Sequence, residues 1–163
     1  MEKLFLNKSQ SVAFTGHRNI DGNKQPELRA AVDNALIELY QSGYRNFING
    51  MAMGFDLLAA SAVIALKRRF SDVKLIAVVP YRNQSEKFSE YEQKRYQYAL
   101  QNADEVIVLR EKYSNCCLLR RNDYMLAHAS GLIAFYDGKH KGGTFYTICR
   151  ASESSMPIIN LFR

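Results

Sequence analysis

The sequence predicts an α/β protein: one three-layer α/β/α, Rossmann-like domain over residues 1–163, built on a mostly parallel sheet. Its length of 163 residues fits a single domain. Its composition, 47% hydrophobic and 23% charged, is that of a soluble globular chain and excludes disordered and fibrous classes. Short apolar runs alternate with helical patterns along the chain, which is typical of a sheet covered by helices on both faces.

In the first half of the chain, proline and glycine mark where the elements begin and end. Pro26 suits the first turn of a helix, and apolar residues then recur at helical spacing until Gly43. Pro80 closes a strongly apolar run. The predicted elements are a strand at 12–15, a helix at 26–43, a strand at 47–49, a helix at 56–67 and a strand at 73–79.

In the second half, Ser85 is the expected cap of the next helix. The run that ends at Leu109 is almost continuously apolar, which suits a strand covered on both faces. The predicted elements are a helix at 85–99, a strand at 105–109, a helix at 118–129, a strand at 132–136, a helix at 144–152 and a strand at 157–160. Such alternation favours right-handed crossovers between parallel strands.

Charge and cysteine content narrow the class of protein further. The net charge of +6 is spread over both halves, so it suits an anionic ligand or weak nucleic-acid attraction without demanding either. Cys116 and Cys117 are adjacent and lack a nearby base, so we interpret them as bystanders; with Cys149 they show no zinc-binding spacing. Residues 3–8 lack the apolar core of a secretory signal. We expect a reduced, cytoplasmic protein with no metal site and no membrane partner.

The loop after the first strand holds the first candidate site residues. Ligands of open α/β sheets bind beyond the carboxyl ends of the strands, and Gly16, His17 and Arg18 follow the first strand directly. Glycine lets a ligand approach the backbone, arginine grips phosphate with a planar fork, and histidine donates a proton. The alternative is a tight turn with two exposed polar residues.

A glycine-bounded loop joins the second strand to its helix. Gly50 and Gly54 would clear space for a nucleotide, with Ala52 between them. Asp56, at the helix start, would bind a ribose hydroxyl, act as a base, or simply cap the helix. The loop contains neither a Walker motif nor a dinucleotide fingerprint, so its pattern leaves these alternatives open.

The strongest local motif is a glycine pair that runs directly into a helix after the fifth strand. Gly142 and Gly143, the expected capping hydroxyl of Thr144 and unpaired N–H groups at the helix start together predict a phosphate site. Arg121, early in the preceding helix, is expected to contribute a guanidinium, and Asn122 beside it is a further candidate for ligand binding. The alternative interpretation is a capped, solvated turn beside a solvated helix face.

Taken in order, these motifs resemble the YpsA family, within the wider SLOG group of Rossmann-like proteins. The matching segments are residues 12–18, 49–56 and 79–81, Gln84, Arg121, Asn122, Met125, and residues 136–138 and 142–144. Each piece is unspecific, but the ordered set is specific. The resemblance implies a strand order near 3-2-1-4-5-6 and a pocket over the first strand. Relatives include LOG-type phosphoribohydrolases, the DNA-processing protein DprA, molybdenum-cofactor carriers and sensors of nucleotide-derived signals.

One position departs from the phosphoribohydrolase pattern of these relatives. That pattern places a glutamate three residues after its threonine, and the glutamate is tied to cleavage of the N-glycosidic bond. Here the third residue after Thr144 is Thr147, whose hydroxyl cannot act as a carboxylate. Whether the protein is an enzyme is therefore left open; if it is, Asp56, His17 and Arg121 are the candidate catalytic residues of a nucleotide hydrolase.

Three functions are compatible with these observations. The first is binding of a nucleotide or nucleotide-derived phosphate compound at the carboxyl edge of the sheet, as in a sensor, with no further cofactor specified. The second is a nucleotide-processing hydrolase of the N-glycosidase type. The third is DNA binding like that of DprA, which the evenly spread charge disfavours. The tyrosines between Tyr91 and Tyr98 form either helix surface or a face for homo-oligomerisation.

Overall fold

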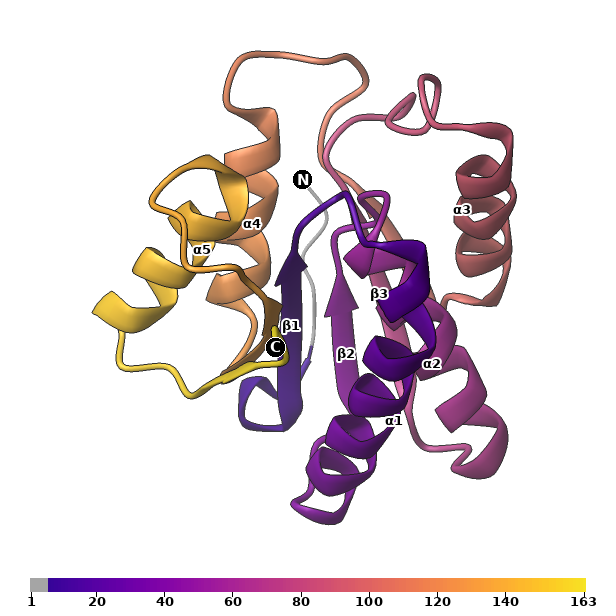
Figure 1. The fold of residues 1–163 in the computed structure, drawn as a ribbon, viewed down its shortest axis with the longest axis vertical. Helices are drawn as coiled ribbons and strands as arrows, with labels where there is room; N and C mark the ends of the chain where they lie inside the picture. Colours follow the sequence, from indigo (N-terminus) through magenta and orange to yellow (C-terminus); the bar gives the residue numbers. More distant parts are fainter. Residues whose placement is uncertain (1–5) are drawn as a thin grey trace.

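The computed structural model describes residues 6–163, which form a six-stranded sheet flanked by five α-helices (Figure 1). The strands are β1 (Ser11–Gly16), β2 (Asn46–Asn49), β3 (Lys74–Val79), β4 (Glu105–Val108), β5 (Gly131–Phe135) and β6 (Ile158–Asn160). The helices are α1 (Gln25–Gln41), α2 (Phe55–Arg69), α3 (Glu90–Asn102), α4 (Cys117–Ala127) and α5 (Gly142–Glu153). Residues 1–5, which include the first part of the segment 3–8, lie outside the described residues, so the prediction for that segment is not tested there.

The sheet is parallel throughout, with strand order β4-β3-β2-β1-β5-β6. The predicted three-layer α/β/α class is confirmed, and so is the 3-2-1 run of strands. The order differs at β4, which pairs with β3 at the sheet edge and not with β1. Although its sequence is apolar, β4 leaves Glu105 and Val106 exposed, which suits an edge strand. Successive strands are therefore added in one direction across the sheet up to β4, and only then does the chain cross back to place β5 beside β1.

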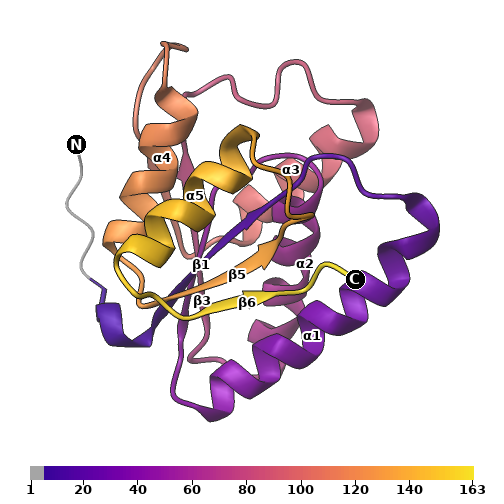
Figure 2. The ribbon, with the colours of Figure 1, turned by 60° about the vertical axis from the view of Figure 1, so that its left-hand side comes forward.

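The order of the strands determines which helices cover each face. The chain moves in one direction from β1 to β4, and α1, α2 and α3 pack on the same face of the sheet (Figure 1). After the reversal, α4 and α5 cover the opposite face, side by side (Figures 1 and 2). Successive strand side chains point to opposite faces, so Phe14 and Phe47 belong to the first core, while Ala13 and Ile48 belong to the second.

Element boundaries follow local capping chemistry. Pro26 lies in the first turn of α1, as predicted. The third helix, however, begins at Glu90 and not near Ser85, because the hydroxyl of Ser89 accepts a hydrogen bond from the Glu92 N–H (3.2 Å). Residues 80–89 instead form turns after β3.

Two further expectations concern membranes and cysteines. Within residues 6–163, no helix combines the length and hydrophobicity needed to span a bilayer. All three cysteines in this part of the chain are free thiols.

The carboxyl ends of all six strands lie at one edge of the sheet, because the strands are parallel. The starts of α2, α4 and α5 lie at the same edge, since each follows a strand. β1 pairs with β2 on one side and β5 on the other, so the crossovers diverge at β1. This divergence is the point at which open α/β sheets bind their ligands.

Candidate functional site

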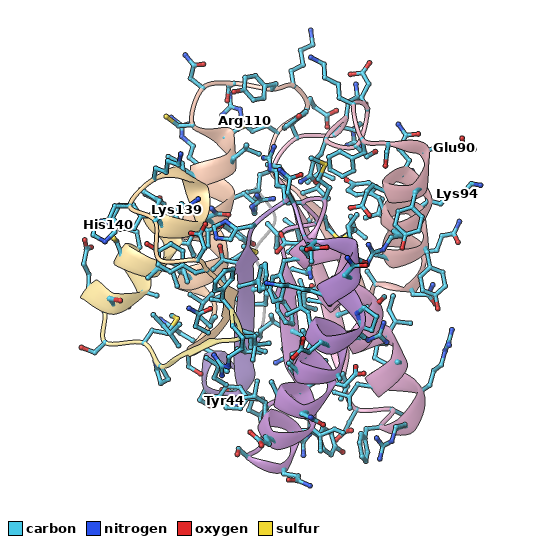
Figure 3. The ribbon with its side chains drawn as sticks, in the orientation of Figure 1. Tyr44, Glu90, Lys94, Arg110, Lys139 and His140 are labelled. Carbon is cyan, nitrogen blue, oxygen red and sulfur yellow. The ribbon has the colours of Figure 1, made fainter. Side chains whose placement is uncertain are left out.

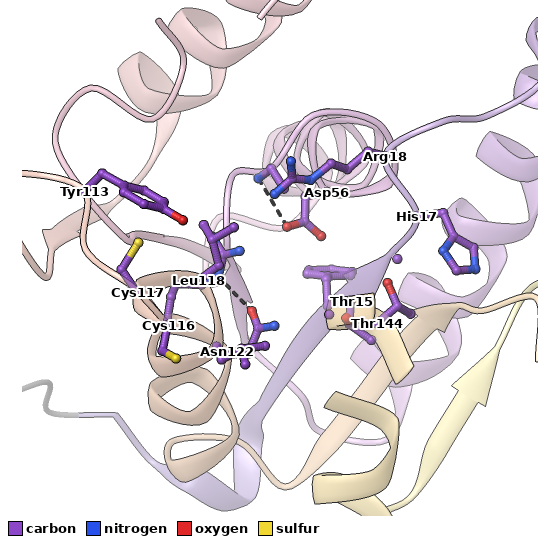
Figure 4. Close-up of a pocket in the computed structure, with 16 residues that line it drawn as sticks. Thr15, His17, Arg18, Asp56, Tyr113, Cys116, Cys117, Leu118, Asn122 and Thr144 are labelled. Carbon is purple, nitrogen blue, oxygen red and sulfur yellow. Dashed lines mark hydrogen bonds between the residues drawn. The ribbon is translucent and has the colours of Figure 1, made fainter. Parts of the chain in front are cut away.

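A cavity of about 430 Å³ opens at this point, over the end of β1 (Figure 4). Its volume lies within the range of roughly 300–1,000 Å³ that is usual for small-molecule sites. Nine of the twelve residues predicted for ligand binding line it. They are Gly16, His17, Arg18, Ala52, Asp56, Arg121, Asn122, Gly143 and Thr144. The structure thus brings together four loops or helix starts that are far apart in the sequence.

Asp56 is a buried carboxylate that lines the cavity, with only 5% of its surface exposed. Its Oδ2 accepts a hydrogen bond from the Ala52 N–H (3.2 Å), whereas its Oδ1 is buried without a hydrogen-bond partner. Burial raises the pKa of Asp56 to about 6; the nearby Arg121 and Arg18 and the Ala52 amide act in the opposite direction. Gly54, not Asp56, is the N-cap of α2, so the carboxyl group reaches back to the preceding loop.

Arg121 is the buried cation of the cavity. Its Nη1 donates to the carbonyl oxygen of Gly50, and its Nε donates to Asn122 Oδ1 (2.8 Å). The same carbonyl accepts a hydrogen bond from Gln84 Nε2 (3.1 Å). Desolvation lowers the pKa of Arg121, and the charge of Asp56 raises it. Arg121 and Asp56 therefore compensate one another electrostatically, and the guanidinium is held in a fixed orientation.

Gly50 and Gly54, which were predicted to clear space for a nucleotide, do not line the cavity. A Cβ on Gly50 would lie 2.8 Å from Arg121 Nε, so glycine lets the guanidinium pack against this loop. Gly54 has a φ of +82°, and a Cβ there would lie 2.2 Å from the Arg18 carbonyl oxygen. Both glycines therefore support the cavity without lining it, because Gly50 lets the Arg121 side chain approach the backbone and Gly54 lets the Arg18 carbonyl approach it.

The start of α5 forms one wall of the cavity through Gly143 and Thr144. The N-cap of this helix is Lys141, and it makes no side-chain capping bond. The prediction that Thr144 caps the helix is thus wrong, because Thr144 is its third residue. Gly142, at φ +90°, turns the chain into the helix just outside the cavity lining. The first-turn N–H groups consequently have neither an intrahelical acceptor nor a cap.

His17 joins the loop after β1 to the loop after β5. The backbone N–H of Asp137 donates to His17 Nε2 (2.9 Å), and Asp137 Oδ1 lies 3.1 Å from the same nitrogen. The Lys139 N–H lowers the pKa of Asp137, against a raising effect of burial. Lys139 and His140, labelled in Figure 3, are exposed and do not line the cavity. His17 thus stabilises the cavity rim.

Five cavity residues lie in a segment to which the sequence pattern assigns no role. They are Tyr113, Cys116, Cys117, Leu118 and Leu119. Tyr113, Cys116, Cys117 and Leu118 lie across the cavity from His17 and Thr144 (Figure 4). The segment follows β4 and so ends at the same sheet edge, which is the one signal that could have identified it. The two adjacent cysteines, which the sequence pattern left without a role, therefore line the cavity.

Two other observations bear on chemistry. Thr147, which stands where the phosphoribohydrolase pattern has glutamate, is buried, and its Oγ1 donates to the Gly143 carbonyl (2.9 Å). It does not line the cavity. Within residues 6–163, no group of three or more His, Cys, Asp or Glu side chains is arranged to hold a metal ion.

The fold and the cavity together define a Rossmann-like α/β/α protein with its candidate site at the switch point of a parallel sheet. The chain belongs to the YpsA family, described as the YspA SLOG family, which it matches over residues 12–158. It is 31% identical over 128 residues to the SPbeta prophage-derived protein YoqJ of Bacillus subtilis, covering 71% of this chain and 73% of that one. It is 26% identical over 129 residues to a UPF0398 protein of Bacillus licheniformis, covering 78% and 70%.

Two solved structures share the fold. DNA processing protein A from Helicobacter pylori, whose structure concerns single-stranded DNA binding, superposes with a TM-score of 0.64 at 19% identity. The match covers 93% of this chain but only 64% of that one. The structural-genomics protein TM1055 superposes with a TM-score of 0.57 at 16% identity, covering 91% and 72%. At these identities, the likeness establishes the fold alone.

Proposed function

We propose that the cavity binds a nucleotide or a nucleotide-derived small molecule through its phosphate and ribose groups. One observation carries the proposal: a single opening combines an uncapped helix start, two arginines and one buried carboxylate with an unpaired oxygen. Among the described residues that line the cavity, Asp56 has the only acidic side chain, whereas His17, Arg18 and Arg121 have basic side chains. This balance favours an anionic ligand that also carries hydroxyl groups.

The α5 side of the cavity is suited to phosphate. The N–H groups of Gly143 and Thr144 belong to the first turn of a twelve-residue helix, where the helix dipole favours anions. Arg18 is exposed at the cavity and presents a planar guanidinium, which matches two phosphate oxygens at once. Together they would supply backbone and side-chain donors to the same anion.

The α2 side is suited to a sugar hydroxyl. Asp56 Oδ1 is a buried acceptor without a donor, a situation that costs about 1–3 kcal/mol in a folded protein. A ribose hydroxyl placed in the cavity would donate to it and remove that cost. The phosphate and hydroxyl requirements together favour a ribonucleotide-type ligand over inorganic phosphate.

A charge placed at the start of α5 tests this proposal. A thermal-shift panel of ribonucleoside mono- and diphosphates, followed by calorimetric titration, identifies the ligand class; a ligand at 100 times its Kd stabilises the protein by about 2.7 kcal/mol. Gly143→Asp should abolish binding, since the carboxylate would repel the phosphate. The helix should persist, because a negative charge there favours its dipole.

The matched control is Gly143→Asn, which has the same size without the charge. A Cβ at Gly143 has room, since the nearest atom is Asn122 Nδ2 at 3.9 Å. The asparagine variant should retain binding within a few fold. Equal affinity of Gly143→Asp and wild type, or no stabilisation by any compound of the panel, would refute the proposal.

Hydrolysis of the bound nucleotide is the second candidate function, and the raised pKa of Asp56 favours it. A cavity-lining carboxyl group with a pKa of about 6 is suited to general-base chemistry near neutral pH. Incubation of each ribonucleoside monophosphate with the protein would release free base and ribose 5-phosphate, measured by chromatography. Turnover should vanish in Asp56→Asn. Binding without turnover across the panel would leave a binding protein.

DNA binding is tested in the same set of measurements. The structural likeness to a DNA-binding protein extends to the fold alone at 19% identity. A fluorescently labelled single-stranded oligonucleotide, titrated at low salt, would show salt-sensitive anisotropy changes if DNA were the ligand. Silence in this titration alongside nucleotide binding would exclude this alternative.

A further inference from the structure

The two sides of the cavity differ in chemistry. Arg18, Asp56 and Thr144 lie on the side that suits phosphate and ribose. The segment 113–119 contributes an aromatic ring, two thiols and two leucines to the opposite wall, where Asn122 also lies. Tyr113, Cys116, Cys117 and Leu118 of this segment are labelled in Figure 4. A plain sugar phosphate bound to the polar side would leave this wall uncovered, so the cavity provides for a ligand with an additional apolar part.

Tyr113 is the aromatic residue of that wall. Its surface is 62% exposed, which makes it one of the most exposed large hydrophobic side chains among the described residues. Tyr91, equally exposed, lies on α3, away from this cavity, whereas Tyr113 lines it. An aromatic ring exposed inside a cavity offers an apolar face that a planar ligand ring would cover.

The segment that carries this ring is held in place before any ligand arrives. Arg82, in the turns after β3, donates two hydrogen bonds to the Glu111 carboxylate (2.7 and 2.8 Å). The Arg82 N–H also donates to the Arg110 carbonyl (3.1 Å). The ring of Tyr81 packs edge-to-face against Tyr113, with centroids 5.4 Å apart and an interplanar angle of 85°. Such preorganisation lowers the entropic cost of binding.

We infer that Tyr113 is the stacking surface for an aromatic nucleobase, which makes the ligand a base-containing nucleotide and not a sugar phosphate. The inference rests on the proposed function and names the remaining part of its ligand. The base lies against the segment 113–119, the ribose at Asp56, and the phosphate at Arg18 and the start of α5. Stacking on a ring tolerates any base, so the wall selects for aromaticity.

The test compares ligands with and without a base on variants of Tyr113. Calorimetric titrations use the four common ribonucleoside monophosphates and ribose 5-phosphate. Replacing Tyr113 with leucine keeps the apolar bulk but removes the ring. Since stacking of one base on an aromatic side chain corresponds to about 5- to 150-fold in affinity, Tyr113→Leu should weaken nucleotide binding by that factor. Binding of ribose 5-phosphate should be unchanged.

Two aromatic variants serve as controls. Tyr113→Phe should bind nucleotides as the wild type does, because the ring remains. Tyr113→Trp introduces a tryptophan into a chain that has none, so its fluorescence should be quenched by nucleotides and not by ribose 5-phosphate. Quenching would place the base at this position directly.

The possible outcomes separate this inference from the proposed function. Equal affinity for nucleotides and ribose 5-phosphate in the wild type would overturn the role of Tyr113 while leaving phosphate binding intact. A preference for nucleotides that survives in Tyr113→Leu would also overturn it. Absence of binding by all five compounds would overturn both proposals together.

Discussion

Asp56 and Arg121 are charged side chains that the fold buries beneath a cavity, at 5% and 4% exposure. Taking two charges out of water costs free energy that their mutual attraction only partly returns. The raised pKa of Asp56 is the measure of that deficit, since burial outweighs the effect of both nearby arginines. A protein that retains such a pair at a cavity trades stability for a site with fixed charge and orientation.

The first prediction is that Asp56→Asn stabilises the protein above neutral pH. Raising the pKa of Asp56 from 3.8 to about 6 means that the ionised carboxylate costs about 2 to 3 kcal/mol relative to a neutral group. The folded state binds this proton more tightly than the unfolded state, so wild-type stability falls as pH rises from about 4 to about 6. Urea unfolding should therefore show the full gain at pH 8 and almost none at pH 4.

The second prediction is that removing the charge of Arg121 destabilises the protein. Arg121→Met leaves Asp56 buried without its counter-ion, and breaking a buried pair in this way costs about 3–5 kcal/mol. The loss should be largest at pH 8 and smaller at pH 5, where Asp56 is protonated. The double variant Asp56→Asn/Arg121→Met, measured in the same urea series, should recover much of the loss. Additive effects of the two changes would show that the side chains do not interact.

At the scale of elements, sequence patterns were sufficient wherever local chemistry decides the boundary. Prolines, glycines and apolar runs located all six strands and five helices within a few residues, except at the start of α3. There Ser85 and Ser89 both suit an N-cap, but only Ser89 is followed three residues later by a glutamate, Glu92. The place of β4 at the sheet edge depends on tertiary packing, which local patterns do not contain.

The residues of the candidate site could be predicted from the sequence only in part. Loops that carry glycines and charged residues after β1, β2 and β5 were identified because strand ends locate ligand sites. The Tyr113 segment carries no such motif; it follows β4 at the same sheet edge, and the position of α4 over β1 brings it to the cavity. The supporting role of Gly50 and Gly54 also depends on which side chain packs behind them.

Substitution of Gly54 should damage the junction between the β2 loop and α2. Gly54→Ala combines a positive φ, which costs a residue with a Cβ about 1–2 kcal/mol, with a contact of 2.2 Å to the Arg18 carbonyl oxygen. Gly138 also has a positive φ, but a Cβ there would meet no other atom, so Gly138→Ala should cost only the free energy of the unfavourable φ. Gly22→Ala has neither and should be nearly neutral.

Urea unfolding of these three variants separates backbone strain from steric contact. The expected order of stability loss is Gly54→Ala, then Gly138→Ala, then Gly22→Ala. If Gly54→Ala cost no more than Gly138→Ala, the loop would have room to move away from Arg18. The shape of the cavity would then not depend on the close approach of Gly54 to the Arg18 carbonyl oxygen.

At the scale of the whole molecule, the sheet separates two layers of unequal size. The layer of α1, α2 and α3 contains most of the large buried side chains, whereas α4 and α5 cover a smaller core. α2 buries ten residues and α5 only two. The cavity lies between the layers, with Asp56 from one side and Arg121, Asn122 and Gly143 from the other. A ligand there would contact both layers at once.

Native-state hydrogen exchange should therefore reveal two levels of protection. Amides of α5 should exchange at least about tenfold faster than those in the middle of α2, because local opening is easier where less apolar surface is buried. The nucleotide that stabilises most in the thermal-shift panel should slow exchange at the starts of α4 and α5, since bound ligand must dissociate before that layer opens. The Gly143→Asp variant, which should not bind, serves as the control. Equal exchange in α2 and α5 of the free protein would show that both layers open only together, in one cooperative unit.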